Sequence, residues 1–154
     1  IVRNNILAFS ELQQLQATRV EEHLSFILER NIIYWDTGKL LAGRWNQIRH
    51  ASRKNCFWNA TGKPFDFAGM SLEAWQAAGQ ELGSIVANPL FKNPREGDFT
   101  LAANSPVLPL GFQQFVSTEA GVYGDPRWVR KAKEVTFEPL LIAPDPPPLL
   151  TGEN

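Results

Sequence analysis

Three short segments of this chain share one pattern, in which an asparagine is followed by a run of apolar residues. They are residues 5–9 (NILAF), 31–35 (NIIYW) and 55–59 (NCFWN). From Asn5 to Asn31 is 26 positions, and from Asn31 to Asn55 is 24. Self-similarity at a period of roughly 20–50 residues is the signature of a stacked repeat architecture. Because the repeated unit is a strand and not a helix pair, the pattern predicts a parallel β-solenoid.

The asparagines have a defined role in such a fold. Asparagine adopts a left-handed backbone at low cost, so we expect each of the three to sit at a turn between two strands. Its side-chain amide would then hydrogen-bond to the asparagine of the next coil, while the apolar residues that follow stack on their counterparts. The alternative is that asparagine followed by hydrophobic residues recurs by chance in a β-rich chain.

Composition limits the classes of function. The chain has 154 residues, 44% hydrophobic and 20% charged, which is typical of one globular domain. Its net charge of −1 gives no reason to expect nucleic acid or an anionic membrane as a partner. No apolar run approaches the ~20 residues that a membrane helix needs. A single cysteine, Cys56, excludes an internal disulfide framework, and its place in a repeat predicts a small buried hydrophobic residue.

The rest of the chain predicts coils followed by a cap. Residues 10–24 are expected to form a polar insertion, and residues 39–49 a loop. Ser71 as an N-cap and an amphipathic pattern predict a helix at about 71–83. Short strands are expected at 84–87 and 98–101, and Asp125-Pro126 predicts the start of a second helix that ends near Glu134. Trp75 and Trp128 are expected to anchor the two helices.

We expect two regions. Residues 1–112 would form the C-terminal coils of the solenoid, and residues 113–154 a cap helix with a proline-rich tail that begins at Ala143. Ile1 already falls within a predicted strand, and no signal peptide or initiating methionine precedes it. We therefore expect the chain to be the C-terminal part of a longer protein, whose preceding coils would pack on residue 1 onward.

Several motifs resemble the closing coils of right-handed parallel β-helix proteins of the pectate-lyase-like superfamily. They are residues 55–59, 62–69 (GKPFDFAG), 71–75 (SLEAW), 84–91 (SIVANPLF), 97–101 (GDFTL) and 105–108 (SPVL). Residues 21–26 (EEHLSF) and 30–36 (RNIIYWD) are similar to a narrower bacterial group akin to glycoside hydrolase family 141. Asn88 stands where the pattern more often has Asp, and either residue can start that turn. The resemblance implies an all-β, right-handed parallel β-helix with one or two short capping helices, in a lyase or a glycoside hydrolase.

Glycoside hydrolysis needs two carboxyl groups that face one groove. We predict Glu21, Glu22 and Asp36 as the candidate catalytic residues, because they flank the second strand set where strands give way to loops. Arg19 and His23 lie beside these acids and are predicted to bind substrate and to tune the carboxyl groups. The alternative is a solvated charged loop that pairs with itself.

Aromatic residues supply candidate sugar-stacking surfaces. Trp45 and its neighbour Arg44 lie on the expected loop and are predicted to bind substrate. For Trp35 and Trp58, packing in the core or on a flank is the alternative. No Asp/Glu cluster has calcium-ligand spacing and no His pair has metal spacing, so we expect no metal and no cofactor, and favour hydrolysis over a calcium-dependent lyase reaction.

The sequence thus predicts the C-terminal part of a bacterial carbohydrate-active enzyme, secreted or periplasmic. It would hydrolyse a polysaccharide or oligosaccharide by paired-carboxylate acid/base catalysis, with some catalytic residues upstream of Ile1. The alternatives are a non-catalytic polysaccharide-binding or adhesion solenoid, and a polysaccharide lyase. An enzyme would show carboxyl groups that converge across coils, whereas a binding module would show aromatic surfaces without them.

Overall fold

The computed structural model describes residues 1–64, 66–116 and 121–138. The chain divides into two compact units, Ile1–Ser117 and Thr118–Asn154. The boundary expected between residues 112 and 113 stays a prediction.

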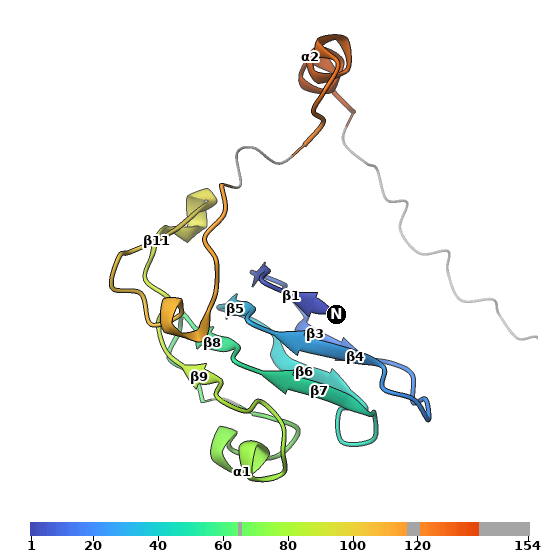
Figure 1. Ribbon diagram of the computed structural model, residues 1–154, viewed down its shortest axis with the longest axis vertical. Helices are drawn as coiled ribbons and strands as arrows, with labels where there is room; N and C mark the ends of the chain where they lie inside the picture. Colours follow the sequence, from blue (N-terminus) through green and yellow to red (C-terminus); the bar gives the residue numbers. More distant parts are fainter. Residues whose placement is uncertain (65, 117–120, 139–154) are drawn as a thin grey trace, which may run out of the picture. The chain divides into compact units, whose positions relative to one another are not determined.

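The first unit is a parallel β-solenoid of about three turns (Figure 1). The first coil contains β1 (Val2–Arg3), β2 (Ile6–Ala8) and β3 (Gln13–Ala17), and the second contains β4 (Phe26–Glu29), β5 (Ile32–Trp35) and β6 (Lys39–Gly43). The third contains β7 (His50–Arg53) and β8 (Cys56–Asn59), after which β9 (Ile85–Val86) continues the stack. The parallel sheets are β1-β4-β7, β2-β5-β8-β9 and β3-β6. The all-β solenoid is therefore confirmed, and the right-handed sense of its coils stays a prediction.

Strand register fixes the repeat length. Ile6 pairs with Ile32, Ile32 with Cys56, and Cys56 with Ile85. Equivalent residues on successive coils are therefore 26, 24 and 29 positions apart. The spacing of the three asparagines in the sequence is thus the true coil length, and the longer last repeat accommodates a helix.

The third side of the coils is the main departure from the sequence prediction. Strand β3 lies within the expected polar insertion, and β6 lies within the expected loop; they pair with each other in parallel. Leu15 and Leu41 are in register, as are Ala17 and Gly43, and Leu15, Ala17 and Leu41 pack in the core. The first two coils therefore have three sides.

The asparagines form the predicted ladder. The side chain of Asn5 donates to that of Asn31 (3.0 Å), and the side chain of Asn31 donates to that of Asn55 (3.1 Å). The backbone prediction was wrong by one position: the left-handed residues are Asn4, Arg30 and Lys54, with φ of 57°, 52° and 53°. The chain turns before each asparagine, which leaves the amide free to bond between coils.

Glu81 and Ser84 close the ladder. Ser84 stands in register with Asn55, and its hydroxyl accepts the Asn55 backbone N–H (2.8 Å) and donates to the Glu81 carboxyl group (2.6 Å). The Asn55 side chain also donates to Glu81 (2.8 Å). Glu81 is only 4% exposed, and burial raises its pKa. The last amide of the row thus has a partner although no fourth asparagine follows.

Sheet β2-β5-β8-β9 is buried on both faces. Ile33 and Phe57 face the inside of the coils, whereas Ile32 and Cys56 face outward and are covered by residues from the chain that follows β9. Burial on both faces explains why this sheet reads in sequence as continuous apolar runs and not as an alternation. Cys56 is fully buried, as predicted.

After the third coil, helix α1 (Leu72–Ala77) lies at the end of the stack (Figure 1). Ser71 caps it, as predicted, by accepting the Ala74 N–H (3.2 Å), and Trp75 anchors it in the core with 5% exposure. The chain that follows β9, residues 87–112, is called the covering segment. It contains β10 (Phe91–Asn93), the 3₁₀ turn η1 (Pro94–Glu96), β11 (Asp98–Leu101) and the 3₁₀ turn η2 (Leu108–Leu110). Strands β10 and β11 form an antiparallel hairpin.

In the second unit, the described residues 121–138 include helix α2 (Pro126–Glu134). Asp125 caps it by accepting the Arg127 N–H (2.8 Å), as the sequence predicted. Trp128, expected to anchor the helix, is 60% exposed. The proline-rich tail from Ala143 lies outside the described residues.

Candidate functional site

The charged residues predicted from sequence lie on the connection between β3 and β4. Arg19 forms an ion pair with Glu21 (2.9 Å), and both side chains contact solvent. Arg49 donates to the backbone carbonyl of Glu22 (2.7 Å). Glu22 and His23 are exposed. The structure therefore brings Arg19 and Glu21 together.

Asp36 lies at a different corner of the coil, between β5 and β6. Its carboxyl group pairs with Arg95 of the covering segment (2.8 Å). The five residues of β6 separate this corner from the next, a span of roughly 15 Å at ~3.3 Å per residue. Glu21 and Glu22 lie on the connection between β3 and β4, at the other end of the side that β3 and β6 form. The structure thus does not bring Asp36 together with either of them.

Trp45 belongs to the core. Only 5% of it is exposed, and its indole N–H donates to the Leu15 carbonyl (3.3 Å). Its ring makes edge contacts with Phe26 and His50, whose centroids lie 5.6 Å and 5.1 Å away. A sugar-stacking surface needs an exposed ring face, which Trp45 does not offer. Its neighbour Arg44 is exposed and starts the turn that follows β6.

A groove of about 450 Å³ lies between the outer face of β5 and the covering segment. Tyr34 supplies its wall on the solenoid side. The other lining residues come from the covering segment: Asn88, Leu90, Phe91, Lys92, Pro94, Thr100, Leu101 and Ala102. Pockets that bind small ligands commonly have volumes of about 300–1,000 Å³. This groove is therefore large enough for one or two sugar rings.

Two aromatic rings, Tyr34 and Phe91, line the groove. Tyr34 makes edge contacts with Phe9 (5.3 Å between centroids) and Phe91 (5.5 Å). Strand register places Ala8, Tyr34 and Trp58 in one row across the sheet, and both aromatic residues of this row are half-buried. Burial raises the pKa of the Tyr34 hydroxyl; the charge of Arg95 opposes this shift and that of Asp36 adds to it. Tyr34 therefore stays a neutral hydroxyl that can donate and accept hydrogen bonds.

Lys92 lines the groove, and it and the charged residues near it are held in pairs. Besides Asp36 with Arg95, Lys92 pairs with Asp98 (3.3 Å). Hydrogen bonds from Thr100, including its backbone N–H (3.1 Å), lower the pKa of Asp98. Arg95 also lies over the ring of Phe9, 5.6 Å from its centroid. The groove therefore combines an apolar aromatic wall with fixed polar groups.

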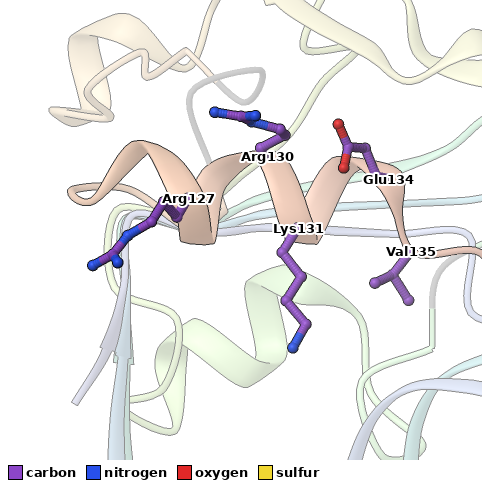
Figure 2. A pocket seen from close by; sticks show the side chains of 5 residues that line it. All are labelled: Arg127, Arg130, Lys131, Glu134 and Val135. Carbon is purple, nitrogen blue, oxygen red and sulfur yellow. The ribbon is translucent and has the colours of Figure 1, made fainter.

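The second unit has a shallow hollow of about 290 Å³ on helix α2 (Figure 2). Figure 2 shows Arg127, Arg130 and Lys131 projecting from the helix in different directions, with Glu134 one turn further on. The Arg127 guanidinium is tied to Asp125 (2.7 Å), and Lys131 lies over the ring of Trp128 (5.6 Å). These contacts are those of a solvated helix surface, and we assign no site to it.

No family model, curated protein or solved structure matches the chain. None of the helices within the described ranges combines the length and apolar character that a membrane span requires. Over the same residues, no group of three or more His, Cys, Asp or Glu side chains is placed to hold a metal ion. The site must therefore be judged from its own geometry.

Tyr34 lies in a predicted repeat strand, residues 31–35, but was not among the predicted site residues. The available signal was that Tyr34 and Trp58 occupy equivalent positions of the repeat, three residues after Asn31 and Asn55. What sequence did not reveal is that residues 88–102 fold back over this row and convert a flat sheet face into a groove.

Proposed function

We propose that this chain binds a carbohydrate in the groove between Tyr34 and the covering segment, as part of a carbohydrate-active β-solenoid protein. The proposal includes a relationship of this chain to the pectate-lyase-like superfamily, and to the group akin to glycoside hydrolase family 141. The ligand would be a polysaccharide or oligosaccharide.

The observation that carries the proposal is the row of Tyr34 and Trp58, in which Tyr34 lines a groove that combines apolar and aromatic side chains with a few polar groups. Aromatic rings offer a flat apolar face with little conformational entropy to lose, and one face of a sugar ring is apolar in the same way. Asn88, Thr100 and the Tyr34 hydroxyl can bond to sugar hydroxyl groups. A site of this kind fixes both the stacking plane and the orientation of a sugar.

Binding without hydrolysis is favoured over catalysis by the state of the acids. A glycosidase needs a general acid of raised pKa and a second carboxyl group, about 5–9.5 Å apart. Asp36 and Asp98 are held in ion pairs, and the pKa of Asp98 is lowered. Burial raises the pKa of Glu81, but this group closes the asparagine ladder.

Glycoside hydrolysis is the second candidate function. It is favoured by Asp36, which directly follows β5 and pairs with Arg95 of the covering segment. The acids predicted from sequence, Glu21, Glu22 and Asp36, would then act with residues outside the described ranges. A polysaccharide ligand also makes a secreted or periplasmic location part of the proposal, with neither nucleic acid nor membrane as a partner.

Binding to a panel of neutral and acidic polysaccharides tests the proposal, by affinity electrophoresis followed by calorimetry on the best ligand. Thr100→Trp fills the groove from an exposed position of β11 and should abolish binding. Trp58→Ala should weaken binding about 3–10-fold, the value of one aromatic contact. The matched control is Trp128→Ala, which removes an exposed tryptophan of the second unit and should change nothing.

Two results would overturn the proposal: no polysaccharide binds the wild type, or Thr100→Trp binds as well as the wild type while circular dichroism shows both folded. The same samples decide between the two functions. Reducing-sugar release that is lost in Asp36→Asn would favour hydrolysis, whereas binding without release favours a binding module.

A further inference from the structure

His50 is a buried histidine that the carbohydrate groove does not use. It is the first residue of β7, and only 8% of it is exposed. Its Nδ1 lies 3.5 Å from the Ile48 carbonyl oxygen, which favours this nitrogen as the site of the proton in the neutral ring. Its Nε2 is buried and has no hydrogen-bond partner among the described residues. A second proton on this ring would therefore find no acceptor.

Aromatic rings pack against the His50 side chain. Phe26 is in register with His50 on the preceding coil, and its ring centroid lies 5.7 Å from that of His50. The ring of Trp75 stacks on His50 with a centroid distance of 6.1 Å, and Trp45 meets the ring edge-on at 5.1 Å. Trp75 is the buried residue that anchors helix α1 in the core. His50 therefore lies at the place where α1 docks on the coils.

Among the described residues, no charged side chain is bonded to the His50 ring. The charged groups on the elements packed around it are paired with each other (Glu29 with Arg53), exposed (Arg44, Arg49 and Glu73) or, for Glu81, bonded to Asn55 and Ser84. A charge in apolar surroundings without a partner is costly. Burial accordingly lowers the pKa of His50, although the hydrogen bond to the Ile48 carbonyl opposes this shift.

We propose that His50 is an acid-sensitive switch for the docking of helix α1: when its ring takes up a proton, the contact with Trp75 weakens and α1 loosens from the core. The stability that the neutral ring contributes is present above about pH 6.5, the ordinary pKa of histidine, and is lost as pH falls below it. The switch involves no ligand, so it is independent of the carbohydrate proposal.

The asparagine ladder should hold under the same conditions. Its amides do not titrate, and Glu81, whose pKa burial raises, contributes its stability at low pH. Gln76 of α1 donates to the backbone carbonyls of Glu81 (2.9 Å) and Ser84 (3.0 Å), which tethers the helix to the end of the ladder. We therefore expect α1 to loosen locally while the coils stay folded.

The test compares hydrogen exchange of assigned backbone amides in the wild type and in His50→Phe, at equal pH, from about pH 7.5 down to about pH 5. Phenylalanine keeps an aromatic ring in the stack but does not titrate. The N–H groups of Trp75 and Ala78 donate to carbonyls of α1 and its cap. Below about pH 6.5 their exchange should become faster in the wild type than in the variant, by up to about tenfold per pH unit.

Two controls accompany this comparison. The N–H of Cys56, which donates to the Asn31 carbonyl (2.9 Å), reports on the ladder and should show no such trend. His23→Gln removes the other histidine of the chain, which is exposed, and should behave as the wild type does. If His50→Phe does not fold, His50→Gln, which does not titrate either, takes its place.

Three results would overturn the switch. The first is a ratio of exchange rates at Trp75 and Ala78 that does not change with pH. The second is an equal change at Cys56, which would mean that the coils open as a whole and that α1 does not loosen by itself. The third comes from a direct NMR titration of the His50 ring: a pKa above about 6.5 would show that the surrounding aromatic rings stabilise the charged form.

Discussion

Replacing Asn31 by alanine tests how the coils are held together. Asn31 is 1% exposed, and its Oδ1 accepts from the backbone N–H and the side chain of Asn5, each at 3.0 Å. Its Nδ2 donates to the carbonyls of Val2 (3.0 Å) and Glu29 (3.1 Å) and to Asn55 Oδ1 (3.1 Å). One side chain thus serves three coils.

The stability lost in Asn31→Ala can be estimated from the hydrogen bonds that the partners of Asn31 keep after the change. The Glu29 carbonyl keeps the Asn4 N–H (3.3 Å), and Asn55 Oδ1 keeps the Asn31 N–H (2.9 Å). The part-buried Asn5 backbone N–H keeps no partner among the described residues, and leaving it unsatisfied costs about 1 kcal/mol, the low end of the range for a buried group. The other hydrogen bonds of the Asn31 side chain are also lost, and its removal leaves a small cavity. We therefore expect the free energy of unfolding to fall by about 3 kcal/mol.

The matched control is Asn5→Ala, at the end of the row. Asn5 is half-buried, and Asn31 Oδ1 still accepts the Asn5 backbone N–H after the change, so we expect a loss of about 1 kcal/mol. Urea unfolding followed by tryptophan fluorescence and near-ultraviolet circular dichroism measures both. In the double variant the two losses should not add, because the side chains interact directly. An Asn31→Ala loss no greater than that of Asn5→Ala would refute the ladder as a source of stability.

Two further predictions follow from buried titratable groups. Because the folded-state pKa of Glu81 is raised, the stability that its carboxyl group contributes is present at low pH and is lost as pH rises through that pKa. Glu81→Gln keeps an acceptor oxygen but does not titrate, so in urea unfolding the stability of this variant relative to the wild type should improve as pH rises. A difference in stability that does not change with pH would contradict this. Burial raises the pKa of Cys56 to about 12, so iodoacetamide should label the thiol at about pH 8 only after unfolding in urea, and rapid labelling of the native protein would contradict its place in the sheet.

The sequence predicted the features that repeat. Asparagine followed by apolar residues recurs because each coil needs the same turn and the same two-sided burial, so Asn31 and Asn55 revealed the coil length and the ladder. Strand β3 was missed because its sequence, QQLQA, is mostly polar, and only Leu15 and Ala17 contribute to the core. Whether a segment forms a strand depends more on how its side chains pack against neighbouring strands than on the residue types alone. A mostly polar strand is therefore predicted as a loop from its sequence.

The site was harder to predict than the fold. Trp45 was expected on an exposed loop, but its ring fills the coil interior beside Phe26 and His50. The groove at Tyr34 depends on a contact with residues more than fifty positions later, which no local pattern encodes. The acids Glu21 and Asp36 looked close because they flank one strand pair, but the coil places them at different corners. Side-chain geometry across coils therefore decides which charged residues meet.

A titration of ¹⁵N-labelled protein with the oligosaccharide that it binds best is the most direct test of carbohydrate binding in the groove. The backbone amides of Tyr34 and Thr100 and the indole N–H of Trp58 should shift together and saturate. The indole resonances of the buried Trp35 and Trp75 should stay in place. Shifts confined to the connection that carries Glu21, with Tyr34, Thr100 and Trp58 unmoved, would contradict the account.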